Sequence, residues 1–253
     1  MIMKKNIRLF WALASAALTF AAASCQQDDT LRYNNITMGN VTAGSFISDQ
    51  GNTFNVVEQN CTEKIDTMKR VLVVCDVLRK TEDKENEYDI RLNMAKPVLT
   101  KSPLVMSEIT DEEAMVTDPI QIKEIWYSGG YLNMFIMIPV ESGSKGRHLV
   151  NLVLDDKTSA GDSYTLELRH NGFGEVWSKD NPDYVLGGAY VSFPLGDMIS
   201  GNSAKVTLLW KWHKAAGNGW SLEVVENKLE FEWKRGTFEQ APLSLVSKAA
   251  DIM

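Results

Sequence analysis

Cys25 has the clearest chemical context of any residue in the chain. It follows the small residues 22–24 at the end of an apolar run over residues 9–23. A short basic head precedes this run, so the pattern is that of a secretory signal peptide rather than a membrane span. We therefore expect residues 1–24 to be removed, which makes Cys25 the first residue of the mature chain.

The junction sequence Ala-Ala-Ser-Cys resembles the lipobox of bacterial lipoproteins, whose cysteine is diacylated and becomes the N-terminus. This resemblance implies that Cys25 is the site of lipid attachment in an outer-membrane lipoprotein, at the periplasmic face or the cell surface, because two acyl chains suffice for stable anchoring. The alternative is a soluble secreted protein in which Cys25 is a bystander. Gln26, Gln27, Asp28 and Asp29 resemble the acidic surface-export tag of Bacteroides lipoproteins; the alternative is a solvated linker.

Cys61 and Cys75 would lie in a compartment that permits disulfides, so a bridge between them is possible. Cys75 belongs to an apolar run over residues 71–77 and would also fit as a small buried hydrophobic residue. In a simple hairpin, Cys61 would face about Thr67 instead. Two cysteines without a Cys-x-x-Cys or histidine spacing do not make a zinc site.

The three histidines, His148, His170 and His213, each fall on an expected strand. No serine or cysteine nucleophile signature lies near them, and no metalloprotease or phosphate-loop motif occurs. Asp155, Asp156 and Asp162 could bind Ca²⁺ together with loop carbonyls, but aspartates at such positions are also ordinary turn formers. We predict no catalytic residue, no metal and no cofactor, and we expect that the protein is not an enzyme.

Charge and composition narrow the class of partner. Removal of residues 1–24 changes the net charge from −7 to −10, because this segment carries three positive and no negative side chains. An acidic chain without a basic run repels phosphate backbones, and the N-terminal unit has few aromatic rings that could stack on bases. We therefore expect no nucleic-acid partner. The polar residues 25–34 are expected to be a tether between the membrane and the folded part.

Residues 35–117 contain short β-rich runs separated by polar turns, and their number and length suit a five-stranded OB-like barrel. The run over residues 71–77 is apolar on both faces, which predicts a strand buried on both sides. Residues 87–96 alternate and predict a half-buried strand, with Met94 on the same face as Tyr88. The expected strands cover residues 36–47, 53–58, 68–78, 87–96 and 104–109.

Residues 118–240 predict a second all-β unit, a β-sandwich, because its strand signals have the right length and spacing. An acidic segment places the boundary near Thr117, and residues 241–253 form a tail without a clear pattern. Gly129 and Gly130 indicate a hairpin, since glycine readily adopts the positive φ of tight turns. The expected strands cover residues 120–127, 131–140, 148–155, 164–170, 189–195, 205–213, 220–225 and 229–234.

Most tryptophans of the second unit, such as Trp210 and Trp233, alternate with polar residues on one strand face and are expected in the core. Phe173, Trp177 and Trp220 differ, because they lie in or beside glycine-rich loops. An aromatic ring in such a loop can present a flat face to a sugar or a peptide. The alternative is that the ring folds back over the core.

Three stretches carry a resemblance to a known family: Arg-Val-Leu-Val-Val-Cys-Asp-Val-Leu (residues 70–78), Tyr-Asp-Ile-Arg-Leu (88–92) and Lys-Pro-Val-Leu-Thr-Lys-Ser-Pro (96–103). Together with the lipobox and tether, they resemble the NigD-like lipoproteins of Bacteroides and Prevotella. This resemblance implies an N-terminal OB-like domain and a C-terminal β-sandwich. The family name comes from a bacteriocin locus in which an immunity role was proposed. Cys25 is the only functional residue that the resemblance carries over.

These observations predict an all-β cell-envelope lipoprotein that binds or assists a protein, peptide or glycan. Binding would use loops of the sandwich or the groove between the two units. A bacteriocin-immunity factor is the alternative that the family resemblance implies. A hydrolase acting on polysaccharide is a further alternative, which would need a cleft with two neighbouring carboxylates.

Overall fold

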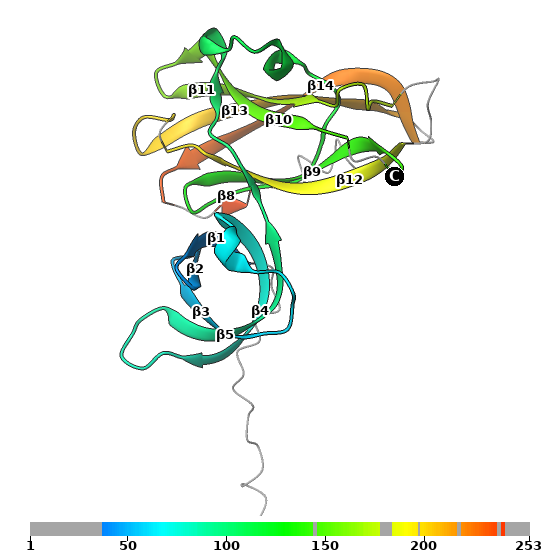
Figure 1. Cartoon of the computed structure of the whole chain (residues 1–253). Helices are drawn as coiled ribbons and strands as arrows, with labels where there is room; N and C mark the ends of the chain where they lie inside the picture. Colours follow the sequence, from blue (N-terminus) through cyan, green and yellow to red (C-terminus); the bar gives the residue numbers. More distant parts are fainter. Residues whose placement is uncertain are drawn as a thin grey trace, which may run out of the picture.

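The computed structural model describes residues 37–143, 146–177, 184–196, 198–216, 219–236 and 239–240. These residues form a closed five-stranded barrel and a β-sandwich of two five-stranded sheets (Figure 1). The helices in this part of the chain are short 3-10 turns. The expected all-β fold class is therefore confirmed. No helix among the described residues is long and apolar enough to cross a membrane.

The barrel strands follow one another around the barrel in the order β1-β2-β3-β5-β4, and β1 pairs with β4 to close it. β3 and β5 are parallel, whereas the other neighbours are antiparallel. This mixed five-stranded barrel is OB-like, as the sequence predicted. The strands are β1 (Thr37–Thr42), β2 (Ser45–Ser48), β3 (Thr53–Gln59), β4 (Arg70–Lys80) and β5 (Glu87–Pro97).

The barrel reaches five strands by a division of the sequence that differs from the expected one. The first run, residues 36–47, contains two strands because the chain turns at Gly44, whose φ is 77°. The last expected strand, residues 104–109, does not enter the barrel. A short hairpin within one β-rich run gives no break in the alternation of side chains, and pattern alone therefore missed it.

β4 contributes to two apolar clusters, as predicted from its run over residues 71–77, which is apolar on both faces. Val71 and Val73 lie in the barrel core with Phe46. Leu72 packs in a second cluster with Val98, and this cluster also contacts side chains of the sandwich. The barrel and the sandwich therefore share buried apolar surface along one face of β4.

β5 changes face at a bulge, because no residue of β4 pairs with Asn93 and the alternation slips by one residue. Ala95 consequently lies in the barrel core. Met94 instead faces the sandwich and packs in the same apolar cluster as Trp126. The expectation that Met94 shares a face with Tyr88 was wrong, since a period of two cannot register a bulge.

The sandwich consists of one sheet in the order β14-β13-β11-β10-β7 and a second in the order β15-β8-β9-β12-β6. The β8–β9 turn has φ values of 58° at Gly129 and 86° at Gly130, which confirms the expected hairpin. The main strands are β8 (Gln121–Ser128), β9 (Tyr131–Glu141), β10 (Leu149–Ala160), β11 (Ser163–Asn171), β12 (Tyr184–Pro194), β13 (Ser203–Ala216), β14 (Gly219–Lys234) and β15 (Glu239–Gln240).

β14 is one continuous strand where the sequence predicted two. Its polar residues Glu226, Asn227 and Lys228 have the composition of a turn, but each pairs with a residue of β13. β14 lies at the edge of its sheet, where charged side chains reach solvent and discourage pairing with other chains. The expected core tryptophans are confirmed, because Trp210, Trp212 and Trp233 are all buried between the sheets.

A strap over residues 98–117 connects the two units and belongs structurally to the sandwich. β6 (Leu99–Thr100) pairs with β12, and β7 (Leu104–Val105) pairs with β10. The 3-10 turns η2 (Met106–Glu108) and η3 (Glu112–Met115) then pack on β10 and β11. The sandwich therefore begins before the expected boundary near Thr117, because strands of two residues leave no periodic signal in the sequence.

Candidate functional site

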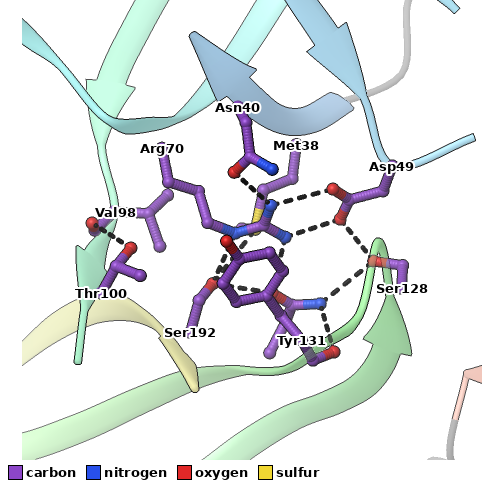
Figure 2. Close-up of polar contacts among 10 residues, drawn as sticks. Met38, Asn40, Asp49, Arg70, Val98, Thr100, Ser128, Tyr131 and Ser192 are labelled. Carbon is purple, nitrogen blue, oxygen red and sulfur yellow. Dashed lines mark hydrogen bonds and ion pairs between the residues drawn. The ribbon is translucent and has the colours of Figure 1, made fainter. Parts of the chain in front are cut away.

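Arg70 lies at the centre of the contact between barrel and sandwich (Figure 2). Its side chain is 1% exposed and forms a two-pronged ion pair with Asp49, at N–O distances of 2.9 and 2.6 Å. Nε donates to Oγ of Ser192 at 3.0 Å, and Nη2 donates to Oδ1 of Asn133 at 2.9 Å. The guanidinium carbon also lies 4.0 Å from the centre of the Tyr131 ring.

The partners of Arg70 bond to one another as well. Ser128 Oγ donates to Asp49 at 2.5 Å and accepts from the amide of Asn133 at 3.0 Å. Gly129 lies against Asp49, and a Cβ at this position would collide with the carboxylate. Paired polar side chains thus fill the contact between the two units. The expected groove between the units is therefore no candidate for ligand binding at this place.

The loop over residues 171–177, which contains Phe173 and Trp177, lies at the opposite end of the sandwich, where Glu175 accepts from the amide of Glu141. β9 begins at Tyr131, beside Arg70, ends at Glu141, and pairs with β12 over its whole length. At about 3.3 Å per residue, this strand places its far end roughly 33 Å from the barrel contact. We call residues 146–148 and 171–177, which lie at this end, the distal loops.

A buried chain of side chains lies beneath the surface of the distal loops. His170 is fully buried, and its Nδ1 lies 3.1 Å from the carbonyl oxygen of Pro119. Because a carbonyl only accepts, Nδ1 carries the proton, and Nε2 of the neutral ring accepts from Nδ1 of His148 at 3.0 Å. Nε2 of His148 makes no hydrogen bond within the described residues and lies 3.4 Å from the carboxylate of Glu175. That carboxylate accepts from the backbone amide of Glu141 at 3.1 Å.

Burial holds His170 in its neutral form. It lowers the pKa of this histidine to about 4, and the neighbouring His148 adds to the shift. A neutral ring with one donor and one acceptor connects Pro119 to His148, and the ring of His148 lies beside Glu175 of the loop. Among the described residues, no group of three or more His, Cys, Asp or Glu side chains could hold a metal ion.

Phe173 and Arg147 form the exposed part of the distal loops. Phe173 is 42% exposed and has a φ of 51°, which is uncommon for a residue other than glycine. Its amide donates to Oδ1 of Asn171 at 2.9 Å, and this bond helps to hold the turn. The guanidinium of Arg147 lies 4.6 Å from the centre of the Phe173 ring and pairs with Glu113 of the strap at 2.7 Å.

Trp177 folds back onto the core, which is the alternative that the sequence left open. Its ring centre lies 5.8 Å from that of Trp212 and 5.3 Å from that of His213. Its Nε1 donates to the carbonyl oxygen of Tyr184 at 3.3 Å. Trp177 thus covers one end of the core, and only Phe173 of the two presents its ring to solvent. The side chain of Trp220 lies outside the described residues.

The remaining predicted residues fall into two groups. Cys25 and residues 26–29 precede the described part of the chain, so lipid attachment and the export tag stay predictions. Cys61 and Cys75 are free thiols, and the possible disulfide is not formed. Cys75 lies in the barrel core, and burial raises the pKa of its thiol to about 11. Cys75 is therefore a small buried hydrophobic residue, which is the alternative that the sequence left open.

Sequence reasoning missed Arg147 and Glu175 as partners of the predicted residues. Both lie in loops whose composition is that of any solvated turn, and no pattern distinguishes them. The contact between His148 and His170 had a signal in principle. Val150 pairs with His170 across the β10–β11 hairpin, and His148, two residues earlier, lies on the same face. A correct prediction of the register of this hairpin would therefore have shown that the two histidines are neighbours.

Comparison with known protein families identifies the type of the sandwich domain. Residues 102–225 match the model of the NigD-like C-terminal beta sandwich domain. The chain therefore carries a NigD-like C-terminal β-sandwich domain, and the resemblance to the NigD-like proteins is confirmed. The match begins within the strap, after β6 and before β7, and so includes the strand β7 that pairs with β10 of the sandwich.

Solved structures share the two-unit fold at low sequence identity. A protein of unknown function from Bacteroides vulgatus is 21% identical with a TM-score of 0.58, covering 83% of this chain and 97% of its own. A NigD-like immunity protein from Bacteroides caccae is 17% identical with a TM-score of 0.60, covering 79% and 96%. A candidate lipoprotein from Bacteroides fragilis is 15% identical with a TM-score of 0.54, covering 79% and 98%. The comparison with curated proteins found no match.

Proposed function

We propose that this protein is an outer-membrane lipoprotein, anchored through Cys25, that binds a protein or glycan partner and catalyses no reaction. The lipobox pattern supports the anchor, and a candidate lipoprotein from Bacteroides fragilis has a similar fold. None of the three similar structures described above carries the name of an enzyme. These features favour a binding or accessory role at the cell envelope.

The binding surface in this proposal is the pair Phe173 and Arg147 on the distal loops. The observation that carries it is an exposed aromatic ring held at positive φ with a guanidinium stacked on it. Unusual backbone conformations cluster at ligand contacts, and aromatic and arginine side chains provide most of the energy in protein interfaces. The buried histidine chain supports this pair from below. It fixes the loop before a partner arrives and so reduces the entropy lost on binding.

Replacing Phe173 with alanine, or Arg147 with alanine, is expected to reduce partner binding about tenfold or more, equivalent to about 1.4 kcal/mol. The alanine variants lose the ring or the charge at the centre of the proposed surface. Proximity labelling by the anchored full chain in intact cells measures protein partners. A glycan array with the purified full chain measures glycans.

Val57→Ala is the matched control, because Val57 is an apolar residue of the barrel that is 52% exposed. Its labelling pattern should equal that of the wild type. If Phe173→Ala and Arg147→Ala also label the same proteins at wild-type yield and bind the same glycans, the distal loops are not the binding surface.

Replacing Cys25 with serine is expected to release the protein from the membrane fraction and to abolish incorporation of labelled fatty acid. The thiol is the acceptor of the diacylglyceryl group, and a hydroxyl does not replace it in this reaction. Cys61→Ser is the control and should remain in the membrane fraction with full labelling. Membrane retention of the Cys25→Ser variant would contradict lipid anchoring and favour the bystander alternative.

Immunity against a secreted toxin is the second candidate function. It is favoured by the similarity of this fold to a NigD-like immunity protein from Bacteroides caccae. In this case the distal loops would bind the toxin. Deletion of the gene should then make the strain sensitive to its cognate bacteriocin. Unchanged sensitivity would exclude immunity and leave the general binding role in place.

A further inference from the structure

A concave pocket of about 460 Å³ lies between the strap and β10, outside the distal loops. β7 pairs along β10, and η2 and η3 also pack on β10, so both arms of the strap lie against this strand. Leu149 and Asn151 of β10 line the pocket, together with the apolar side chains of Leu104 and Ile109 from the strap. Pockets of this volume with mainly apolar walls accept small organic ligands.

Lys101 is the only basic residue of the pocket lining. Its half-buried ammonium donates to the carbonyl oxygen of Val150 at 3.1 Å and to Oδ1 of Asn151. Both acceptors are neutral, and an ammonium carries three hydrogens, so one hydrogen and the full charge remain to be matched by a ligand. Burial lowers the pKa of Lys101, which is the behaviour of a desolvated cation. A carboxylate is the group that supplies both an acceptor and the opposite charge.

Two exposed carboxylates restrict the ligand further. Glu108 and Asp111 also line the pocket, whereas the ammonium of Lys101 bonds to Val150 and Asn151. Their negative charges disfavour phosphates and dicarboxylates, because every additional charge on the ligand is repelled. The apolar walls favour a short hydrocarbon chain. A single carboxylate on such a chain therefore matches the pocket best.

We propose that this pocket binds a monocarboxylate on a short apolar chain. Its carboxylate pairs with Lys101, and its hydrocarbon part lies against Leu104, Ile109 and Leu149. A free branched-chain acid and an apolar amino acid share this chemistry. The proposal is independent of the partner-binding role of the distal loops, because Phe173 and Arg147 do not line the pocket.

Titration calorimetry with the full chain compares 4-methylpentanoate with its uncharged analogue, 4-methylpentanamide. The acid is expected to bind saturably and the amide at least about tenfold more weakly, because the amide lacks the charge that pairs with Lys101. Leucine is the third ligand. Tighter binding of leucine than of 4-methylpentanoate identifies an amino acid as the natural ligand, and the reverse identifies a free acid.

Lys101→Met removes the charge and keeps an unbranched apolar chain. This variant is expected to lose the preference for the acid over the amide, whereas Lys123→Met, at a half-buried lysine of the other sheet, should retain it. The comparison of acid with amide on the wild-type protein does not depend on the folding of any variant. Equal affinity for acid and amide, or no saturable binding of the acid, would overturn the proposal.

Discussion

Replacement of Arg70 by methionine is expected to lower the free energy of unfolding by about 3–5 kcal/mol. The variant leaves the buried carboxylate of Asp49 without its ion-pair partner. It also removes the two hydrogen bonds that Arg70 donates to Ser192 and Asn133. An unpaired buried charge costs more than the ion pair itself contributes. Urea unfolding followed by circular dichroism and tryptophan fluorescence measures the change.

The Arg70 variant should also separate the unfolding of the two units. In the wild-type protein, we expect barrel and sandwich to unfold together, because they share the Arg70 network and an apolar cluster. Without Arg70 the barrel is expected to unfold at lower urea concentration than the sandwich, whose tryptophans report separately. Because removal of both charges avoids an unpaired ion, the double variant Arg70→Met with Asp49→Asn should recover part of the loss.

Arg79→Met is the matched control for Arg70. Arg79 pairs with Asp89 at 2.6 Å, but its side chain is 74% exposed. Exposed ion pairs contribute about 0–1 kcal/mol, so this variant should unfold close to the wild type. A loss of less than about 1 kcal/mol for Arg70→Met would mean that water replaces the network and that the contact between the units is not rigid.

Acidification from pH 6.5 to 4 is expected to lower the free energy of unfolding by about 3 kcal/mol through His170 alone. The folded-state pKa of His170 is lowered to about 4, while the unfolded chain has the ordinary value of 6.5. Between these values the unfolded state binds the proton and the folded state does not. The stabilisation is therefore complete above pH 6.5 and is lost as the pH falls towards 4.

His170→Gln tests this pH dependence, because glutamine does not titrate. Its free energy of unfolding should be lower than that of the wild type at pH 7 and should change less between pH 6.5 and 4. Burial also lowers the pKa of His213, so His213→Gln should remove a separate part of the pH dependence and leave the part that comes from His170 in place. Wild-type and His170→Gln curves that run parallel over this range would contradict a buried neutral His170.

Strand content was predictable because alternating side chains signal a sheet directly. The runs that became β8, β9 and β13 stood out in the sequence, and the glycine pair fixed the hairpin between β8 and β9. The errors have one cause. Strand pairing sets all three features that the sequence did not reveal: the turn at Gly44, the bulge at Asn93 and the two-residue strands of the strap. A local pattern does not contain that information.

The site was less predictable than the fold. Phe173 was singled out because glycines surround it, but the same signal selected Trp177, which packs on the core. Whether a loop ring faces solvent or the core depends on the elements that lie beside it. The ring of Trp177 packs against Trp212 and His213 of β13. Arg147 reaches Phe173 from another loop, and no spacing in the sequence relates the two residues.

We propose that the distal loops bind the partner of an anchored envelope protein. A photoreactive amino acid placed at position 173 of the full-length, lipidated chain tests this claim in intact cells, with position 57 on the barrel as the matched control. We expect irradiation to produce a discrete cross-linked species from position 173 that is absent from position 57. The absence of a cross-link from position 173, or the same species at equal yield from position 57, would contradict the claim.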